Sequence, residues 1–164
     1  MKAKIIALTL LSLALPSLAA ENFSVYLVRH AEKQKDVANP SLTQCGHIRA
    51  NQLAKILEKT NIEKVYSTSY ARTLETAAPM ARQNEIAIKQ YSPHGLEQLV
   101  RELKQYGKNV LVVGHSNTTP VLAGLLANQE TAALSEQEYR MIYQVQFVEG
   151  NPSLTILTHP LACR

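Results

Sequence analysis

Apolar residues recur along the chain in two spacings, which predict strands alternating with helices. Four segments carry apolar residues at the i, i+3, i+4, i+7 spacing of a helix face. These faces are Ala50, Leu53, Ala54 and Leu57; Leu74, Ala77, Ala78 and Ala81; Leu96, Leu99, Val100 and Leu103; and Leu122, Leu125 and Leu126, with Val121 beside Leu122. Short β-rich runs at 23–28, 64–67, 86–91, 109–113, 143–148 and 153–158 predict strands. A turn at residues 149–152 joins the last two.

This alternation predicts an α/β fold: a three-layer sandwich whose mostly parallel central sheet has helices on both faces. Runs 25–28 and 110–113 are apolar without alternation, so we expect them to be central strands. The hairpin near the C-terminus is expected to add an antiparallel edge. Ligands of such sheets bind beyond the carboxyl ends of the parallel strands. The residues that follow Val28 and Val113 are therefore the first candidates for a site.

The N-terminal segment differs from the rest of the chain. Lys2 and Lys4 precede an apolar run at residues 5–15, and small residues then surround Ala19. This order predicts a secretory signal peptide, residues 1–19, followed by one domain at 20–164. The run is shorter than the roughly 20 residues of a membrane-spanning helix. We therefore expect a periplasmic or secreted protein without a stable membrane anchor.

Charge and cysteine content add two expectations. Loss of Lys2 and Lys4 with the predicted leader lowers the formal net charge from +4 to +2, too little to indicate a nucleic-acid partner. Cys45 and Cys163 either pair in an oxidising compartment or remain as separate thiols. Neither has the spacing of a metal ligand.

Two histidines follow the predicted central strands. Arg29 and His30 come directly after run 23–28, and His115 follows run 109–113 through a single glycine. Arg72 lies two residues before Leu74, so its side chain points away from that apolar face and toward the strand ends. Arginine forks match phosphate geometry. The pattern predicts a phosphate pocket built by Arg29, His30, Arg72 and His115.

Two further features bear on that pocket. Thr119 and Pro120 are predicted to be the N-cap and first residue of a helix, whose free amides favour an anion. The other three histidines lack a strand-end position and are expected to be ordinary surface or core residues; they are His47, His94 and His159.

Three motifs occur in order along the chain, with a shorter one after the first. They are Leu27-Val28-Arg29-His30-Ala31-Glu32; Leu42-Thr43 with Gly46; Ser67-Thr68-Ser69-Tyr70-Ala71-Arg72-Thr73 followed by Glu75-Thr76; and Val113-Gly114-His115-Ser116-Asn117. The chain thereby resembles the histidine phosphatase superfamily, also called phosphoglycerate mutase-like. The resemblance implies that His30 is a nucleophile whose phosphohistidine intermediate is hydrolysed by water. It also implies that Arg29, Arg72 and His115 stabilise the phosphoryl charge, without a metal or cofactor.

The chain departs from the fuller family pattern in two ways. Family members usually have a residue that protonates the leaving oxygen, and here Glu97, His94 and Asp36 are alternatives. Only 42 residues separate Arg72 from His115, which leaves no room for the inserted cap of larger relatives. We therefore expect an open pocket, which weakens a mutase interpretation.

These residues predict a phosphoric monoester hydrolase. Its expected partners are a phosphorylated small molecule or envelope component, with inorganic phosphate as product. Within the family, the alternatives are a phosphatase of lipopolysaccharide and one of phosphohistidine proteins. Outside it, they are a non-catalytic module that binds a phosphate ligand and a metal site that uses His30 and His115.

Overall fold

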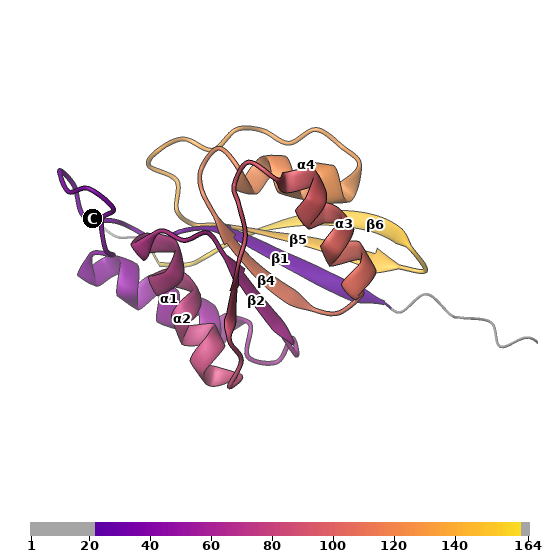
Figure 1. Ribbon diagram of the computed structural model, residues 1–164, viewed down its shortest axis with the longest axis horizontal. Helices are drawn as coiled ribbons and strands as arrows, with labels where there is room; N and C mark the ends of the chain where they lie inside the picture. Colours follow the sequence, from indigo (N-terminus) through magenta and orange to yellow (C-terminus); the bar gives the residue numbers. More distant parts are fainter. Residues whose placement is uncertain (1–21, 162–164) are drawn as a thin grey trace, which may run out of the picture.

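Six strands form one sheet between two pairs of helices in the computed structural model, which describes residues 22–161 (Figure 1). In chain order the elements are β1 (Phe23–Arg29), α1 (Gln44–Ile56), β2 (Lys64–Ser67), α2 (Ala71–Gln83), β3 (Ile88–Gln90), α3 (Leu96–Tyr106), β4 (Val110–Gly114), α4 (Thr119–Ala127), β5 (Met141–Val148) and β6 (Asn151–Thr158). The strand order is β3-β2-β4-β1-β5-β6, with parallel pairing from β3 to β1 and antiparallel pairing beyond. The predicted three-layer α/β fold with an antiparallel hairpin at one edge is confirmed.

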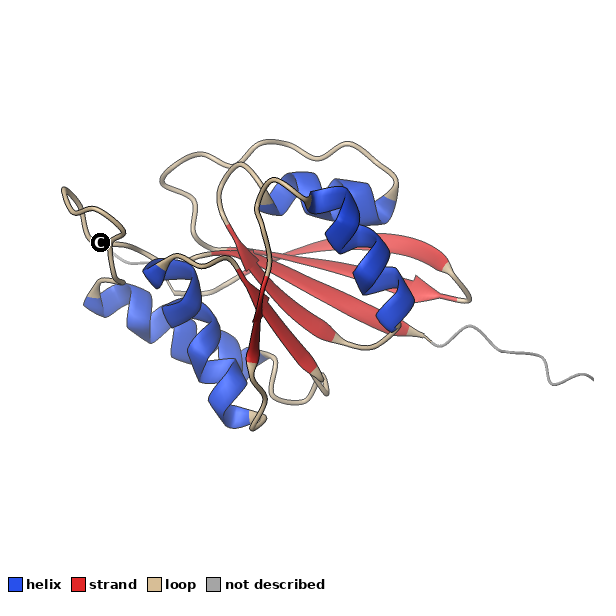
Figure 2. Cartoon of the chain, in the orientation of Figure 1, coloured by secondary structure: helices blue, strands red, loops and turns tan. Residues whose placement is uncertain are grey.

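Helices cover both faces of the sheet (Figure 2). The side chains of β1 accordingly pack in two separate cores. Val25 and Leu27 pack in the apolar core under α3 and α4, whereas Tyr26 and Val28 pack in the core under α1 and α2. Successive side chains of a strand point to opposite faces. A strand buried on both faces therefore needs a continuous apolar run, as the sequence predicted.

The buried face of α2 differs from the predicted one. Thr73 and Thr76 are buried, whereas Leu74 and Ala78 are only partly buried. The hydroxyl of Thr76 donates to the carbonyl of Arg72 and accepts from the amide of Ala31, so hydrogen bonds compensate for its burial. Apolar periodicity finds helices well, but it does not detect a face completed by hydrogen-bonded threonines.

The buried face of α4 and the hairpin turn also differ from the sequence prediction. In α4, Val121 and Leu125 are exposed, and the buried face is narrower than expected. The hairpin turn consists of Glu149 and Gly150 alone, with φ of 51° and 81°, while residues 151 and 152 belong to β6. Two consecutive positive φ angles are typical of a two-residue hairpin turn.

The carboxyl ends of β1 and β4 lie side by side. Arg29 pairs with Gly114 in the parallel register, and the amide of His30 donates to the carbonyl of Gly114 at 2.9 Å. A Cβ on Gly114 would lie 2.9 Å from the hydroxyl oxygen of Thr119, so this position requires glycine. The pairing places His30 and His115 at the same level of one sheet edge.

Helix α1 begins against the loop that follows His30. The side chain of Thr43 caps the helix by accepting from the amide of Gly46, and its own amide donates to the carbonyl of Glu32 at 2.8 Å. A Cβ on Gly46 would collide with that same carbonyl oxygen. The Leu-Thr-x-x-Gly motif therefore fixes the loop behind the first histidine.

Some predictions concern the ends of the chain. The predicted signal peptide, residues 1–19, and Cys163 lie outside the described residues. Cys45 is disulfide-bonded. Among residues 22–161, no helix has the length and apolar character needed to cross a membrane.

We expect Gly46→Ala to lower the free energy of unfolding by about 1–3 kcal/mol, because the added methyl group displaces the Glu32 carbonyl. Chemical denaturation of both proteins measures the difference. Gly95→Ala is the matched control, since its Cβ would have only an ordinary contact of 3.8 Å with Ser92. Equal stability of the wild type and Gly46→Ala would contradict the packing described.

Candidate active site

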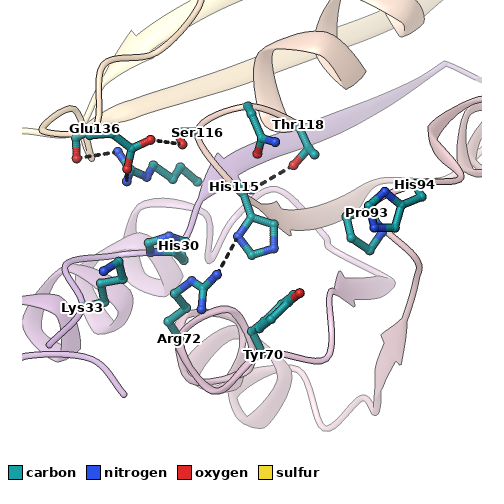
Figure 3. A pocket seen from close by; sticks show the side chains of 12 residues that line it. His30, Lys33, Tyr70, Arg72, Pro93, His94, His115, Ser116, Thr118 and Glu136 are labelled. Carbon is teal, nitrogen blue, oxygen red and sulfur yellow. Dashed lines mark hydrogen bonds and ion pairs between the residues drawn. The ribbon is translucent and has the colours of Figure 1, made fainter. Parts of the chain in front are cut away.

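A cavity of about 510 Å³ opens at the carboxyl edge of the sheet, where β1, β4 and the start of α2 meet (Figure 3). All four predicted residues line it: Arg29, His30, Arg72 and His115. The remaining lining residues come from the surrounding loops and helix starts: Lys33, Tyr70, Pro93, His94, Ser116, Asn117, Thr118 and Glu136. The structure thus brings together residues from five separate parts of the sequence.

His30 is held in one tautomer. Its Nδ1 lies 2.8 Å from the carbonyl oxygen of Ala31, which can only accept, so Nδ1 carries the proton. The Nε2 atom therefore keeps its lone pair. The residue is 3% exposed, and this burial, with the charges of Arg29 and Arg72, lowers the pKa of His30 to about 3. The imidazole is consequently neutral and nucleophilic at neutral pH.

His115 is oriented by a chain of hydroxyl groups. Its Nδ1 is 3.5 Å from the Nη2 of Arg72, which can only donate, so the proton of His115 lies on Nε2. That Nε2 donates to the Thr68 hydroxyl at 2.9 Å, and this hydroxyl contacts the Thr73 hydroxyl, also at 2.9 Å. Burial, followed by the charges of Arg72 and Arg29, lowers the pKa of His115 to about 4.

Arg72 lies in the first turn of α2 and points into the cavity (Figure 3). Its guanidinium carbon lies 4.5 Å from the ring centroid of Tyr70. The Tyr70 ring in turn meets the His115 ring edge-on, with centroids 5.2 Å apart. An aromatic wall thus holds the arginine and the second histidine in place.

Arg29 is almost completely buried and is held by the loop before β5. Its Nη1 donates to the carbonyl oxygens of Ser135, Glu136 and Glu138 at 2.9–3.1 Å. Its guanidinium also stacks at 4.2 Å on the ring of Tyr139. The Nη1 atom is thus used by the protein itself, whereas Nε has no hydrogen-bond partner, so only part of the fork that the sequence predicted for phosphate is available.

Glu136 is a site residue that the sequence did not indicate. Its Oε2 accepts from Arg29 Nη2 at 3.0 Å, and its Oε1 accepts from the Ser116 hydroxyl at 2.6 Å. The hydrogen bond from Ser116 is the main cause of the lowered pKa of Glu136, so the group is a carboxylate at neutral pH. No pattern in the sequence links this loop to the cavity. The carboxylate marks a position where the site accepts negative charge.

The start of α4 also differs from the prediction. Thr118, rather than Thr119, is the N-cap residue, and Thr119 and Pro120 lie in the first turn. The Thr118 hydroxyl accepts from the amide of His115 at 3.0 Å instead of capping the helix. The Thr119 hydroxyl donates to the carbonyl of Val28. Both threonines thus fix the strand ends rather than serving the predicted cap.

The structure separates the three predicted proton donors. His94 lines the cavity, whereas Glu97 lies in the first turn of α3 and Asp36 in an exposed loop, and neither is among the lining residues. His94 is therefore a cavity residue, contrary to the expectation for the other histidines. His47 is exposed and faces Glu75, as expected of a surface residue. No group of three or more His, Cys, Asp or Glu in residues 22–161 is arranged to hold a metal ion.

Comparison with known proteins gives a consistent result for the fold. Residues 25–93 match the family model for the histidine phosphatase superfamily (branch 1). No curated protein sequence matches the chain.

Solved structures with the same fold include three phosphate-handling proteins. The protein histidine phosphatase SixA in complex with tungstate has a TM-score of 0.68 at 19% identity, over 83% of this chain and 97% of that one. The α-ribazole phosphatase from Shigella flexneri has a TM-score of 0.69 at 14% identity, over 83% of this chain and 96% of that one. The phosphoglycerate mutase from Bacillus anthracis str. Sterne has a TM-score of 0.65 at 14% identity, over 86% of this chain and 95% of that one.

The low pKa of His30 predicts a pH-dependent stability. Below pH 6.5 the unfolded chain binds a proton at His30 that the folded protein does not bind until about pH 3, so stability falls as the pH decreases. Between pH 7 and pH 5 we expect the wild type to lose about 2 kcal/mol more than His30→Gln. Urea denaturation in phosphate-free buffer measures this; parallel losses in the two proteins would contradict it.

Proposed function

We propose that this chain is a member of the histidine phosphatase superfamily and hydrolyses phosphomonoesters through a phosphohistidine on His30. The family-model match over residues 25–93 and the fold shared with SixA support this proposal. The observation that carries the proposal is the fixed tautomer of His30. Its Nδ1 proton is committed to the Ala31 carbonyl, so a neutral Nε2 with a free lone pair lies in a cavity that two arginines make positive.

In the first step, Nε2 of His30 attacks phosphorus and the bond to the leaving oxygen breaks. The phosphoryl oxygens carry the charge of the transition state, and arginine and imidazole donors in fixed positions stabilise it. Arg72 contributes its guanidinium. His115 accepts from Arg72 in the free site; proton uptake at its Nδ1 makes it a donor to a bound oxyanion.

Glu136 changes partners in this scheme. Its carboxylate occupies the Nη2 edge of Arg29, where a phosphoryl oxygen would bind. Two anions cannot share that donor without strong repulsion. Glu136 is exposed and lies in a loop, so it can leave Arg29 when phosphate enters. Water then attacks the phosphohistidine, and inorganic phosphate is released.

The leaving oxygen needs a proton unless the alcohol or phenol that it becomes is acidic enough to leave as an anion. Among Glu97, His94 and Asp36, only His94 lines the cavity, so it is the proton donor that we propose. Substrates with acidic leaving groups do not depend on this donor, so they test the role of His30 alone.

For the substrate we propose a phosphorylated small molecule or envelope component, met in the periplasm or outside the cell after removal of residues 1–19. The chain between Arg72 and His115 forms most of α2, then β3, α3 and β4, with no inserted cap, which favours substrates with exposed phosphates. Lipopolysaccharide phosphate fits this class. A phosphohistidine protein is the second candidate, since SixA has a similar fold and its structure contains tungstate, a tetrahedral oxyanion.

Hydrolysis of p-nitrophenyl phosphate tests the proposal, because nitrophenolate leaves without a proton donor. We expect His30→Ala to lower kcat roughly a thousandfold or more, with circular dichroism unchanged. Equal, background-level release of nitrophenol by both proteins would instead indicate a non-catalytic phosphate-binding module. A parallel assay with EDTA addresses a metal site at His30 and His115, since the proposed mechanism predicts no loss of activity.

A further inference from the structure

A second hollow adjoins the active-site cavity. Its volume is about 630 Å³, and it lies between the loop after β1 and the loop before β5. Lys33 and Glu136 line both hollows, so these two residues lie at the boundary between them. Its other lining residues are mostly charged: Glu32, Lys35, Arg49, Gln137, Glu138, Tyr139 and Arg140.

The acidic residues of the second hollow all have a cationic partner. Glu32 accepts from Arg49 Nε at 2.9 Å. Glu138 lies 3.7 Å from Arg140 Nε. Glu136 is bound to Arg29 as described above. The negative charges on the wall of the hollow are therefore already balanced.

The lysines of the second hollow are not balanced in this way. Neither Lys33 nor Lys35 forms an ion pair with any residue in the described part of the chain. Lys33 is also partly buried, and its backbone forms a bridge with Leu42 beside the capped start of α1. An unbalanced ammonium group on a fixed backbone thus stands at the boundary between the two hollows.

We propose that Lys33 binds a second anionic group of the substrate, a phosphate or a carboxylate, while the scissile phosphate lies at His30. The inference rests on the proposed function, and it narrows the substrate class to phosphomonoesters with two anionic groups. A lysine suits this task because its ammonium is a compact point charge that accepts either anion without a fixed geometry. The positive potential of Arg29 and Arg72 adds to the attraction.

Non-hydrolysable phosphonates separate this inference from catalysis. Alkylphosphonates carry one anionic group, α,ω-alkanebisphosphonates carry two phosphonates, and ω-phosphonoalkanoates carry a phosphonate and a carboxylate. Calorimetry gives the dissociation constants for chains of two to five carbons. In the wild type we expect one chain length of a two-anion series to bind roughly three- to tenfold tighter than the matched alkylphosphonate. The series that shows the gain in affinity tells whether the second anionic group is a phosphate or a carboxylate.

Three variants assign this gain to Lys33. Lys33→Met should bring the ratio of the two dissociation constants close to one, and Lys33→Arg, which keeps the charge, should preserve most of the gain. Lys59→Met is the matched control, because it removes a charge from a side chain that is 90% exposed, and its ratio should equal that of the wild type.

Two results would overturn the inference: no gain for either two-anion series in the wild type, or a gain that survives in Lys33→Met. Both leave the proposed function intact as long as alkylphosphonates bind. Absence of any phosphonate binding, together with no His30-dependent hydrolysis, would instead contradict the proposed function itself.

Discussion

The parallel pairing of β1 with β4 is the constraint on which the site depends. It sets Arg29 opposite Gly114, and the hydrogen bond from the His30 amide to the Gly114 carbonyl continues the pairing for one residue beyond β1. The two imidazole rings therefore end 5.7 Å apart by their centroids. Because Gly114 has no side chain, Thr119 can approach and hold the Val28 carbonyl. A change in strand register would separate the two histidines.

Burial and charge together give the two histidines their chemistry. Arg29 and Arg72 make the cavity attractive to an oxyanion, and burial together with the same positive charges keeps both imidazoles neutral in the free protein. Backbone carbonyls and Glu136 compensate for the burial of Arg29 in the free protein. The Nε atoms of Arg29 and Arg72 are buried without a hydrogen-bond partner, so both arginines keep a donor that the protein itself does not use.

The sequence predicted the sheet, its helices and the four central residues because local patterns carry that information. Apolar runs locate β1 and β4, and the residues that follow them lie at the ligand-binding edge. The role of Glu136 could not be predicted in this way, since it depends on how an irregular loop folds back over Arg29. The chain from His115 through Thr68 to Thr73 likewise arises from tertiary packing, as does the position of His94 on the cavity wall.

The central claim, that Nε2 of His30 attacks the phosphoryl group, is tested most directly by trapping the phosphoenzyme. Rapid acid-free quenching after mixing with a phosphomonoester, followed by peptide mass spectrometry and phosphorus NMR, locates the phosphate and identifies the ring nitrogen that carries it. The structure predicts phosphate on Nε2 of His30, because Nδ1 is hydrogen-bonded to the Ala31 carbonyl. Phosphate on Nδ1, on His115 or on Ser116 would contradict the account.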